Sequence, residues 1–123
     1  MQPDITLCRS DLERLQRTLL ALDERTPPLM IERLETELVR AQVVEAAAPD
    51  VVTLGSRVTF LTRETGRTRH IRLVLPEDVE GRDDLSVLTP IGCSLLGLRR
   101  GDVFTWQDAG RSWHLEVCAV EQP

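Results

Sequence analysis

The chain has 123 residues, a length typical of one domain or of one domain with an appendage. Its hydrophobic fraction of 41% can supply a core, which excludes wholesale disorder. The aromatic fraction of 3% and the net charge of −5 argue against a reader of single-stranded nucleic acid and against a general nucleic-acid coat. All 15 basic residues are arginine, which excludes chemistry based on lysine, such as a Schiff base.

The apolar stretches are much shorter than a membrane span, and the first residues lack the basic-then-apolar pattern of a signal peptide. The three cysteines, Cys8, Cys93 and Cys118, are odd in number and widely spaced, so they predict neither a disulfide framework nor a C-x-x-C metal clip. We expect Cys93 and Cys118 to fill the core as small apolar groups. A soluble cytoplasmic protein without membrane contact is the default expectation.

Residues 1–48 are predicted to be helical throughout. Ser10 and Glu13 have the spacing of a capping box. A breaker with two prolines, residues 23–28, separates two apolar stripes of helical period. The stripes are Leu12, Leu15, Leu19 and Leu22, then Ile31, Leu34, Leu38 and Ala41. Two such stripes predict a short antiparallel helical hairpin, a coiled coil with arms of roughly 18–24 Å at 1.5 Å per residue.

The apolar period falls to two after residue 50, which predicts strands. Thr89 and Pro90 can start a brief helix that Gly97 ends. The strands are expected at 57–60, 71–75, 85–88, 103–107 and 113–120, with turns at 65–66 and 108–111. The fold class is therefore α+β: a helical hairpin over residues 1–48, then a small antiparallel sheet with one short helix over residues 51–123.

The first predicted hairpin of the sheet is basic, and the loop after it is acidic. The hairpin carries Arg57, Arg63, Arg67, Arg69 and Arg72. The loop at residues 76–84 carries five acidic residues against one arginine. Two interpretations stay open here: an ordinary solvated surface, or a docking face for a partner of complementary charge.

Two segments carry a pattern that points to a family: VTLGSRVTF at residues 52–60 and LSVLTPIGCSLLGLRRGD at residues 85–102. In order, spacing and turn glycines they resemble the C-terminal domain of the GreA/GreB transcript-cleavage factors, over residues 51–120. A short helical hairpin before such a domain is similar to the Rnk branch, whose members are called regulators of nucleoside diphosphate kinase. The resemblance implies an FKBP-like fold for residues 51–123.

The resemblance also implies binding to bacterial RNA polymerase at the rim of the secondary channel, with no direct DNA contact outside that complex. In the family the contact comes from the loop between a strand and the short helix, which reads Asp-Ser-Pro. The matching positions here are Leu88, Thr89 and Pro90, flanked by Ser86 and Ile91. Leu88 replaces the acid, and an apolar side chain there can pack against a coiled-coil rim.

The predicted hairpin tip carries Asp23, Glu24 and Arg25. A cleavage factor lends two carboxylates to the catalytic metals of the polymerase from the tip of a long arm. Here the arm is only about 20 Å long, and Arg25 can neutralise its acidic neighbours. We therefore expect a non-enzymatic regulator that competes with Gre-type factors without stimulating cleavage. The alternatives are an interaction module for another protein partner, and an active cleavage factor that uses Asp23 and Glu24.

No other motif predicts catalysis, a metal site or a cofactor. His70 and His114 are isolated in sequence, which favours ordinary hydrogen-bonded histidines over metal ligands. Cys93 has no feature of an activated nucleophile. Trp106 and Trp113 face each other across the last predicted hairpin. Packing between the two strands explains this pair more simply than the substrate pocket of a prolyl isomerase does.

Overall fold

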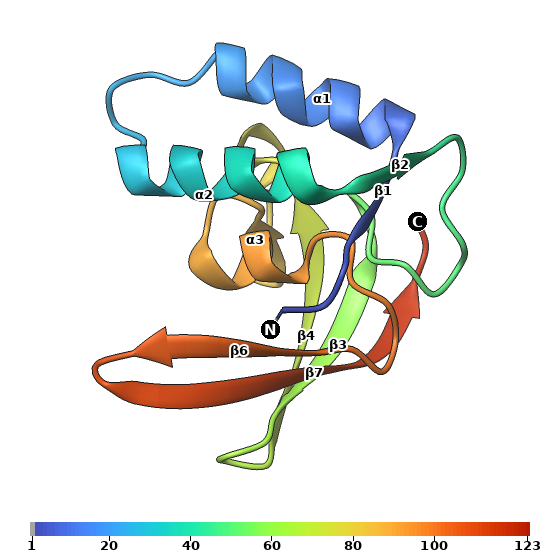
Figure 1. Cartoon of the computed structure of the whole chain (residues 1–123), viewed down its shortest axis with the longest axis vertical. Coiled ribbons are helices and arrows are strands. Elements are labelled where there is room, and N and C mark those ends of the chain that lie inside the picture. The colour runs from blue at the N-terminus through green and yellow to red at the C-terminus, as the bar shows by residue number, and fades with distance from the viewer. Residues whose placement is uncertain (1) are drawn as a thin grey trace.

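The computed structural model describes residues 2–123, which form three α-helices, one 3-10 helix and two sheets (Figure 1). The elements follow in the order β1 (Thr6–Cys8), α1 (Arg9–Leu20), α2 (Pro28–Arg40), β2 (Gln42–Val44), β3 (Arg57–Thr62), β4 (Arg67–Val74), η1 (Pro76–Asp78), β5 (Asp84–Ser86), α3 (Pro90–Leu95), β6 (Val103–Asp108) and β7 (Arg111–Glu121). The α+β class predicted from the sequence is confirmed.

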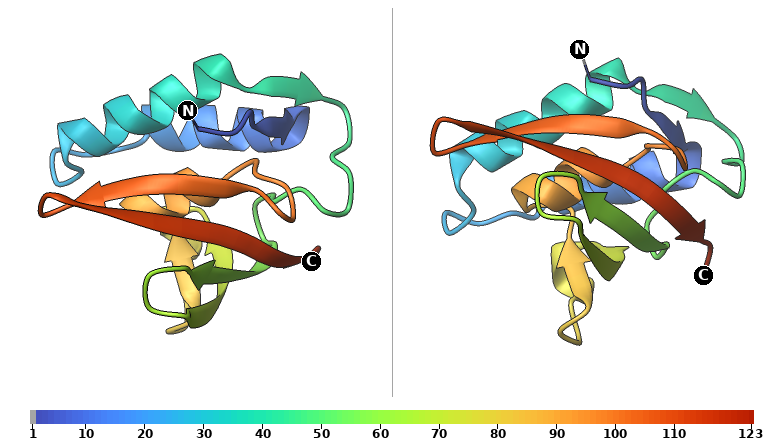
Figure 2. Two further views of the ribbon diagram at one scale, coloured as in Figure 1. Left: turned by 60° about the horizontal axis from the view of Figure 1, so that its bottom comes forward. Right: turned by 90° about the horizontal axis from the view of Figure 1, so that it is seen from below.

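The larger sheet has five strands in the order β5-β4-β3-β7-β6 and is curled (Figure 2). Three of its pairings are antiparallel, and Trp106 lies directly opposite Trp113, as predicted. The prediction of a wholly antiparallel sheet is wrong at one edge, because β5 runs parallel to β4. The connection through η1 leaves the end of β4 and returns to Arg72, so that β5 pairs with Arg72–Val74, the last three residues of β4. A crossover of this kind, rather than a tight turn, is what parallel pairing requires.

The prediction that residues 1–48 are helical throughout is also wrong. β1 and β2 flank the two helices and form a parallel pair, with Thr6 opposite Gln42. The Thr6 N–H donates to Gly97 O over 3.0 Å, and the Gln42 N–H donates to Ile5 O over 2.9 Å. The predicted capping box does not form: Cys8 is the N-cap of α1, without a side-chain cap, and Ser10 lies inside the helix.

Helices α1 and α2 run antiparallel on the same side of the molecule, joined by the loop at residues 21–27 (Figures 1 and 2). Leu15 and Leu34, one from each predicted stripe, are fully buried in one cluster with Val52 and Phe60. The core therefore continues across both halves of the sequence. The division at residues 48 and 51, the coiled-coil packing and the FKBP-like identity of the sheet stay predictions. In the described part of the chain, no helix has both the length and the hydropathy of a membrane span.

Helix α1 is fixed to the second half of the chain by polar contacts as well as by the core. Asp11 is only 5% exposed, and its Oδ2 accepts a hydrogen bond from the Leu54 N–H over 3.0 Å. About two turns later, Thr18 Oγ1 donates to Glu77 Oε2 over 3.0 Å. These two bonds join α1 to two different loops of the second half. The helix therefore lies along the body of the protein.

The prediction for the two later cysteines is half correct. Cys93 is 1% exposed and lies in the core, as expected. Cys118 is only half-buried, so for this residue the prediction is wrong. Leu115 and Val117 of β7 face the core, whereas Cys118 lies at the irregularity where the register between β3 and β7 shifts, and has no partner residue on β3.

The parallel edge of the sheet is held by one ion pair. Arg72 donates to both carboxylate oxygens of Asp84, over 2.8 and 2.9 Å. The backbone N–H groups of Glu80 and Gly81 donate to the same carboxylate. The Arg72 guanidinium, followed by the Glu80 N–H, lowers the pKa of Asp84 well below its ordinary value. This charge-assisted network fixes β5, and with it the start of α3.

We predict that Asp11→Ala destabilises the protein by about 1–3 kcal/mol, because the Leu54 N–H then loses its acceptor in a buried setting. Urea unfolding measures the change. The matched control is Glu13→Ala, on the exposed side of the same helix, which should change stability by less than about 0.5 kcal/mol. Equal effects of the two substitutions would show that the buried contact does not hold α1 in place.

We predict a loss of stability in acid that depends on Asp84. Because folding lowers the pKa of this carboxyl from 3.8, its contribution is complete above that ordinary value and disappears as the pH falls through the folded value. Asp84→Asn should therefore lower the free energy of unfolding at neutral pH and make it less dependent on pH below about 4. The control Asp83→Asn, an exposed neighbour, should retain the pH dependence of the unaltered protein.

Candidate docking site

The junction between β5 and α3 brings together the residues that the sequence predicts for docking. Thr89 is the N-cap of α3: its Oγ1 accepts from the Gly92 N–H over 3.1 Å and donates to Ser86 O over 2.7 Å. Ser86 Oγ accepts from the Leu88 N–H over 3.0 Å. The predicted helix start at Thr89 and Pro90 is confirmed. Both hydroxyls bond to the chain itself, so their main effect is to hold the loop in one shape.

Gly92 makes this tight junction possible, and sequence reasoning missed it. A Cβ at position 92 would lie 2.1 Å from Ser86 O, which no real side chain can do. The residue is buried in the first turn of α3. Its signal in the sequence was a glycine inside a predicted helix, where propensity disfavours it unless packing requires it. The close approach of α3 to β5 therefore depends on the absence of a side chain.

The exposed part of the junction is apolar. Pro90 is exposed, and Leu88 and Ile91 are half-buried against the core. The sequence did not identify the support behind them: Arg33 of α2 donates to Ser94 Oγ over 2.5 Å, and Ser94 Oγ donates to Pro90 O over 2.8 Å. The loop thus presents a preformed apolar surface, which an apolar partner surface could bury at little entropic cost.

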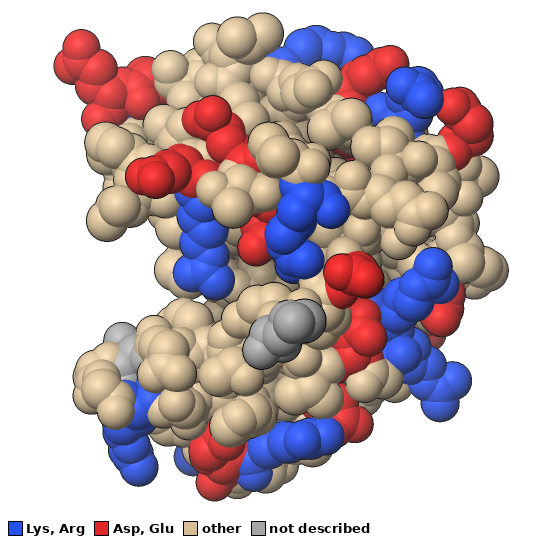
Figure 3. Space-filling view, viewed as in Figure 1, with Lys and Arg blue, Asp and Glu red and all other residues tan. Residues whose placement is uncertain are grey.

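A hollow in the surface lies beside the junction between β5 and α3. The space-filling view shows the surface hollowed between the helices and the β6–β7 hairpin (Figure 3). The small cavity at this place has walls from α2, α3 and β6, including Arg33, Ser94 and Phe104. The docking segment therefore lies beside a concave part of the surface.

Neither the thiol of α3 nor the two histidines of the sheet has the surroundings of a reactive group. Burial raises the pKa of the Cys93 thiol to about 11, so the thiol is protonated at neutral pH and is a poor nucleophile. His70 Nδ1 lies 2.8 Å from Thr59 Oγ1, and His114 Nδ1 lies 2.6 Å from Glu64 Oε2. Both histidines are thus ordinary hydrogen-bonded residues. Within residues 2–123, no three His, Cys, Asp or Glu side chains are arranged to hold a metal ion.

The predicted tip residues lie in the loop between α1 and α2. Asp23 Oδ1 accepts from the Arg25 N–H over 2.9 Å, and the Arg25 Nε lies 3.9 Å from the same carboxylate. Asp23 thus closes a local turn. Glu24 is exposed. A shallow hollow shared by Asp23, Thr26 and Glu77 places the tip beside η1, so the tip stays next to the body.

Comparison with known proteins assigns both halves of the chain. Residues 46–122 match the family model "Transcription elongation factor, GreA/GreB, C-term", and residues 3–44 match the model "Rnk N-terminus". The chain is 37% identical to the regulator of nucleoside diphosphate kinase of Escherichia coli, over 98% of this chain and 90% of that protein. It is 36% identical to the transcription elongation factor GreA of Thermotoga neapolitana, over 73% of this chain and 59% of GreA.

Solved structures agree with the sequence comparisons. The prokaryotic transcription elongation factor GreA/GreB from Nitrosomonas europaea superposes with a TM-score of 0.74 at 34% identity, covering 98% of this chain and 99% of that chain. Gfh1 of Thermus aquaticus has a TM-score of 0.53 at 24% identity, covering 96% of this chain and 98% of its own, and shares the fold. The chain belongs to the GreA/GreB family of transcription elongation factors, as a member with an Rnk-type N-terminus.

Proposed function

We propose that this protein regulates transcription by docking on bacterial RNA polymerase near the secondary channel, through its FKBP-like half. The observation that carries the proposal is the rigid apolar surface at the start of α3, where Leu88, Pro90 and Ile91 are presented on a loop fixed by internal hydrogen bonds. Relatives called transcription elongation factors support a polymerase partner. We do not expect the protein to contact DNA outside that complex, because its net charge of −5 has the same sign as the DNA backbone.

The proposed mode of action is competition without cleavage. α1 has 12 residues and α2 has 13, so the helices are about 18 and 20 Å long at 1.5 Å per residue. Asp11 and Thr18 bind α1 to the body, which keeps the tip from projecting further. A protein of this shape would occupy the rim and exclude longer-armed factors, without placing carboxylates at the catalytic metals. We therefore propose a non-enzymatic role.

The Escherichia coli relative is called a regulator of nucleoside diphosphate kinase. We propose a similar regulatory effect for this chain, by an indirect route through transcription. The proposed place of action is the cytoplasm, where the polymerase works. An indirect route requires no binding site for the kinase on the protein surface.

Substitution of the docking segment should weaken polymerase binding. We expect Leu88→Ala with Pro90→Ala to lower the affinity by about 10- to 100-fold, because each truncated apolar contact costs about 1 kcal/mol or more. Binding is measured by pull-down of the polymerase and by competition against GreB. The matched control is Val79→Ala, an apolar residue on the acidic loop that is 47% exposed, which should retain full competition.

The same assay separates this proposal from docking through the basic hairpin. Arg67→Glu with Arg69→Glu should leave competition unchanged, because these exposed arginines lie on β4, away from the α3 junction. The docking proposal fails if the arginine variant loses binding while the Leu88/Pro90 variant keeps it. Absence of any displacement of GreB at high excess would also contradict it.

The protein should not stimulate transcript cleavage. Stalled elongation complexes mixed with the protein should show only the intrinsic cleavage rate, and Asp23→Ala with Glu24→Ala should not change that rate. The physical reason is reach, since the tip lies beside η1. GreB serves as the positive control. Cleavage above the intrinsic rate that disappears in the double variant would identify an active cleavage factor instead.

A further inference from the structure

The two N-terminal helices carry large apolar side chains that nothing in the described chain covers. Leu20, at the end of α1, is 88% exposed, and Leu29, in the first turn of α2, is 78% exposed. Val39, near the other end of α2, is 87% exposed. Single exposed apolar residues are ordinary, but two of these three lie at the same end of the helix pair. Leu20 and Leu29 both lie at the end that carries the connecting loop.

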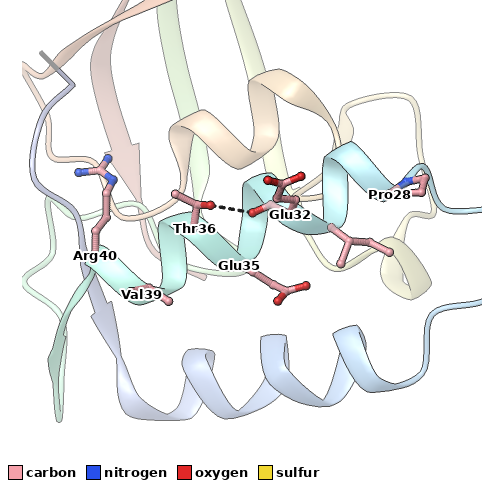
Figure 4. Close-up of a pocket in the computed structure, with 7 residues that line it drawn as sticks. Pro28, Glu32, Glu35, Thr36, Val39 and Arg40 are labelled. Carbon is pink, nitrogen blue, oxygen red and sulfur yellow. Dashed lines mark hydrogen bonds between the residues drawn. The ribbon is translucent and has the colours of Figure 1, made fainter.

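The outer face of α2 is shaped to receive another helix. A shallow hollow runs along it, bordered by Pro28, Glu32, Thr36 and Val39 among others (Figure 4). These residues are spaced three or four apart, so they form one ridge along the helix, with a groove beside it. Side chains of a second helix pack into grooves of this kind.

The outer faces of α1 and α2 carry opposite net charges. The exposed charged residues of α2 on this face include Glu32 and Glu35, and acidic side chains are visible over α2 in Figure 3. The exposed charged residues of α1 are Arg9, Arg14 and Arg17 against Glu13, so the exposed surface of α1 is net positive. Neither Arg17 nor Glu32 forms an ion pair within residues 2–123. The surface of α1 therefore complements that of α2.

We propose that this face binds a second copy of the same chain, in a symmetric dimer that does not depend on the proposed polymerase contact. A two-fold axis parallel to the helices places α1 over the partner's α2, antiparallel, with both connecting loops at the same end. Leu20 then meets the partner's Leu29, and Arg17 meets the partner's Glu32. Two-fold symmetry repeats each contact, so all four exposed leucines gather in one cluster.

The size of the face sets the strength of this dimer. Two helices about 20 Å long and about 10 Å wide offer about 400 Å² per copy, or about 800 Å² in total. Stable interfaces bury about 1,200 Å² or more, so this one is of the weak class. We expect a dissociation constant between about 10 µM and 1 mM.

Sedimentation velocity of the full chain, from about 10 µM to about 1 mM, tests the proposal. The sedimentation coefficient should rise with concentration towards that of a dimer. Leu20→Ser with Leu29→Ser should remain monomeric over the whole range, and its thermal unfolding should be unchanged because both side chains are exposed. Val79→Ser is the matched control, an exposed apolar residue outside this face, and it should associate like the unaltered chain.

A charge exchange tests the arrangement of the two copies. Arg17→Glu and Glu32→Arg should each weaken association several-fold, and the combined variant should restore it, because each altered residue then meets its opposite charge on the partner. A monomer at about 1 mM overturns the proposal, as does a combined variant that stays weak. If the unaltered chain stays monomeric while the leucine variant loses polymerase competition, the proposal is also overturned, and the leucines are identified as a polymerase contact.

Discussion

The arrangement of this molecule depends on the attachment of α1 to the second half of the chain. The buried carboxylate of Asp11 accepts the Leu54 N–H, and Leu15 enters the same core as Phe60. A carboxylate is costly to bury unless it is hydrogen-bonded, so this contact permits one docking position and disfavours others. The helix pair therefore lies along the body, and the tip residues stay beside η1. The proposed competitor without cleavage activity follows from that position.

The elements with enough residues to show a period could be predicted from the sequence. The leucine stripes of α1 and α2 and the alternation in β3, β4, β6 and β7 were sufficient, because burial on one face imposes the period. β1 and β2 have three residues each, too few to show alternation. The direction of β5 could not be predicted either, since it is set by the path of the connection rather than by the residues of the strand.

The resemblance to the family located the candidate docking segment. It did not identify the residues behind that segment that hold it in place. Thr89 and Pro90 predicted the start of α3, because their side chains suit the N-cap and the first turn of a helix. The need for Gly92 and the bond from Arg33 to Ser94 come from tertiary packing between segments distant in sequence. Asp11 was likewise not singled out by the sequence. Its burial arises from a loop more than forty positions later.

The most direct test of this account is a photocrosslinking map of the complex with RNA polymerase, with a photoreactive amino acid placed in turn at Pro90 and at Arg25. Both positions are exposed, so both can carry the probe without disturbing the core. The account predicts that the probe at Pro90 reacts with the rim of the secondary channel, and that the probe at Arg25 does not reach the catalytic metal site. Crosslinks from position 25 to the residues around the catalytic metals would contradict it.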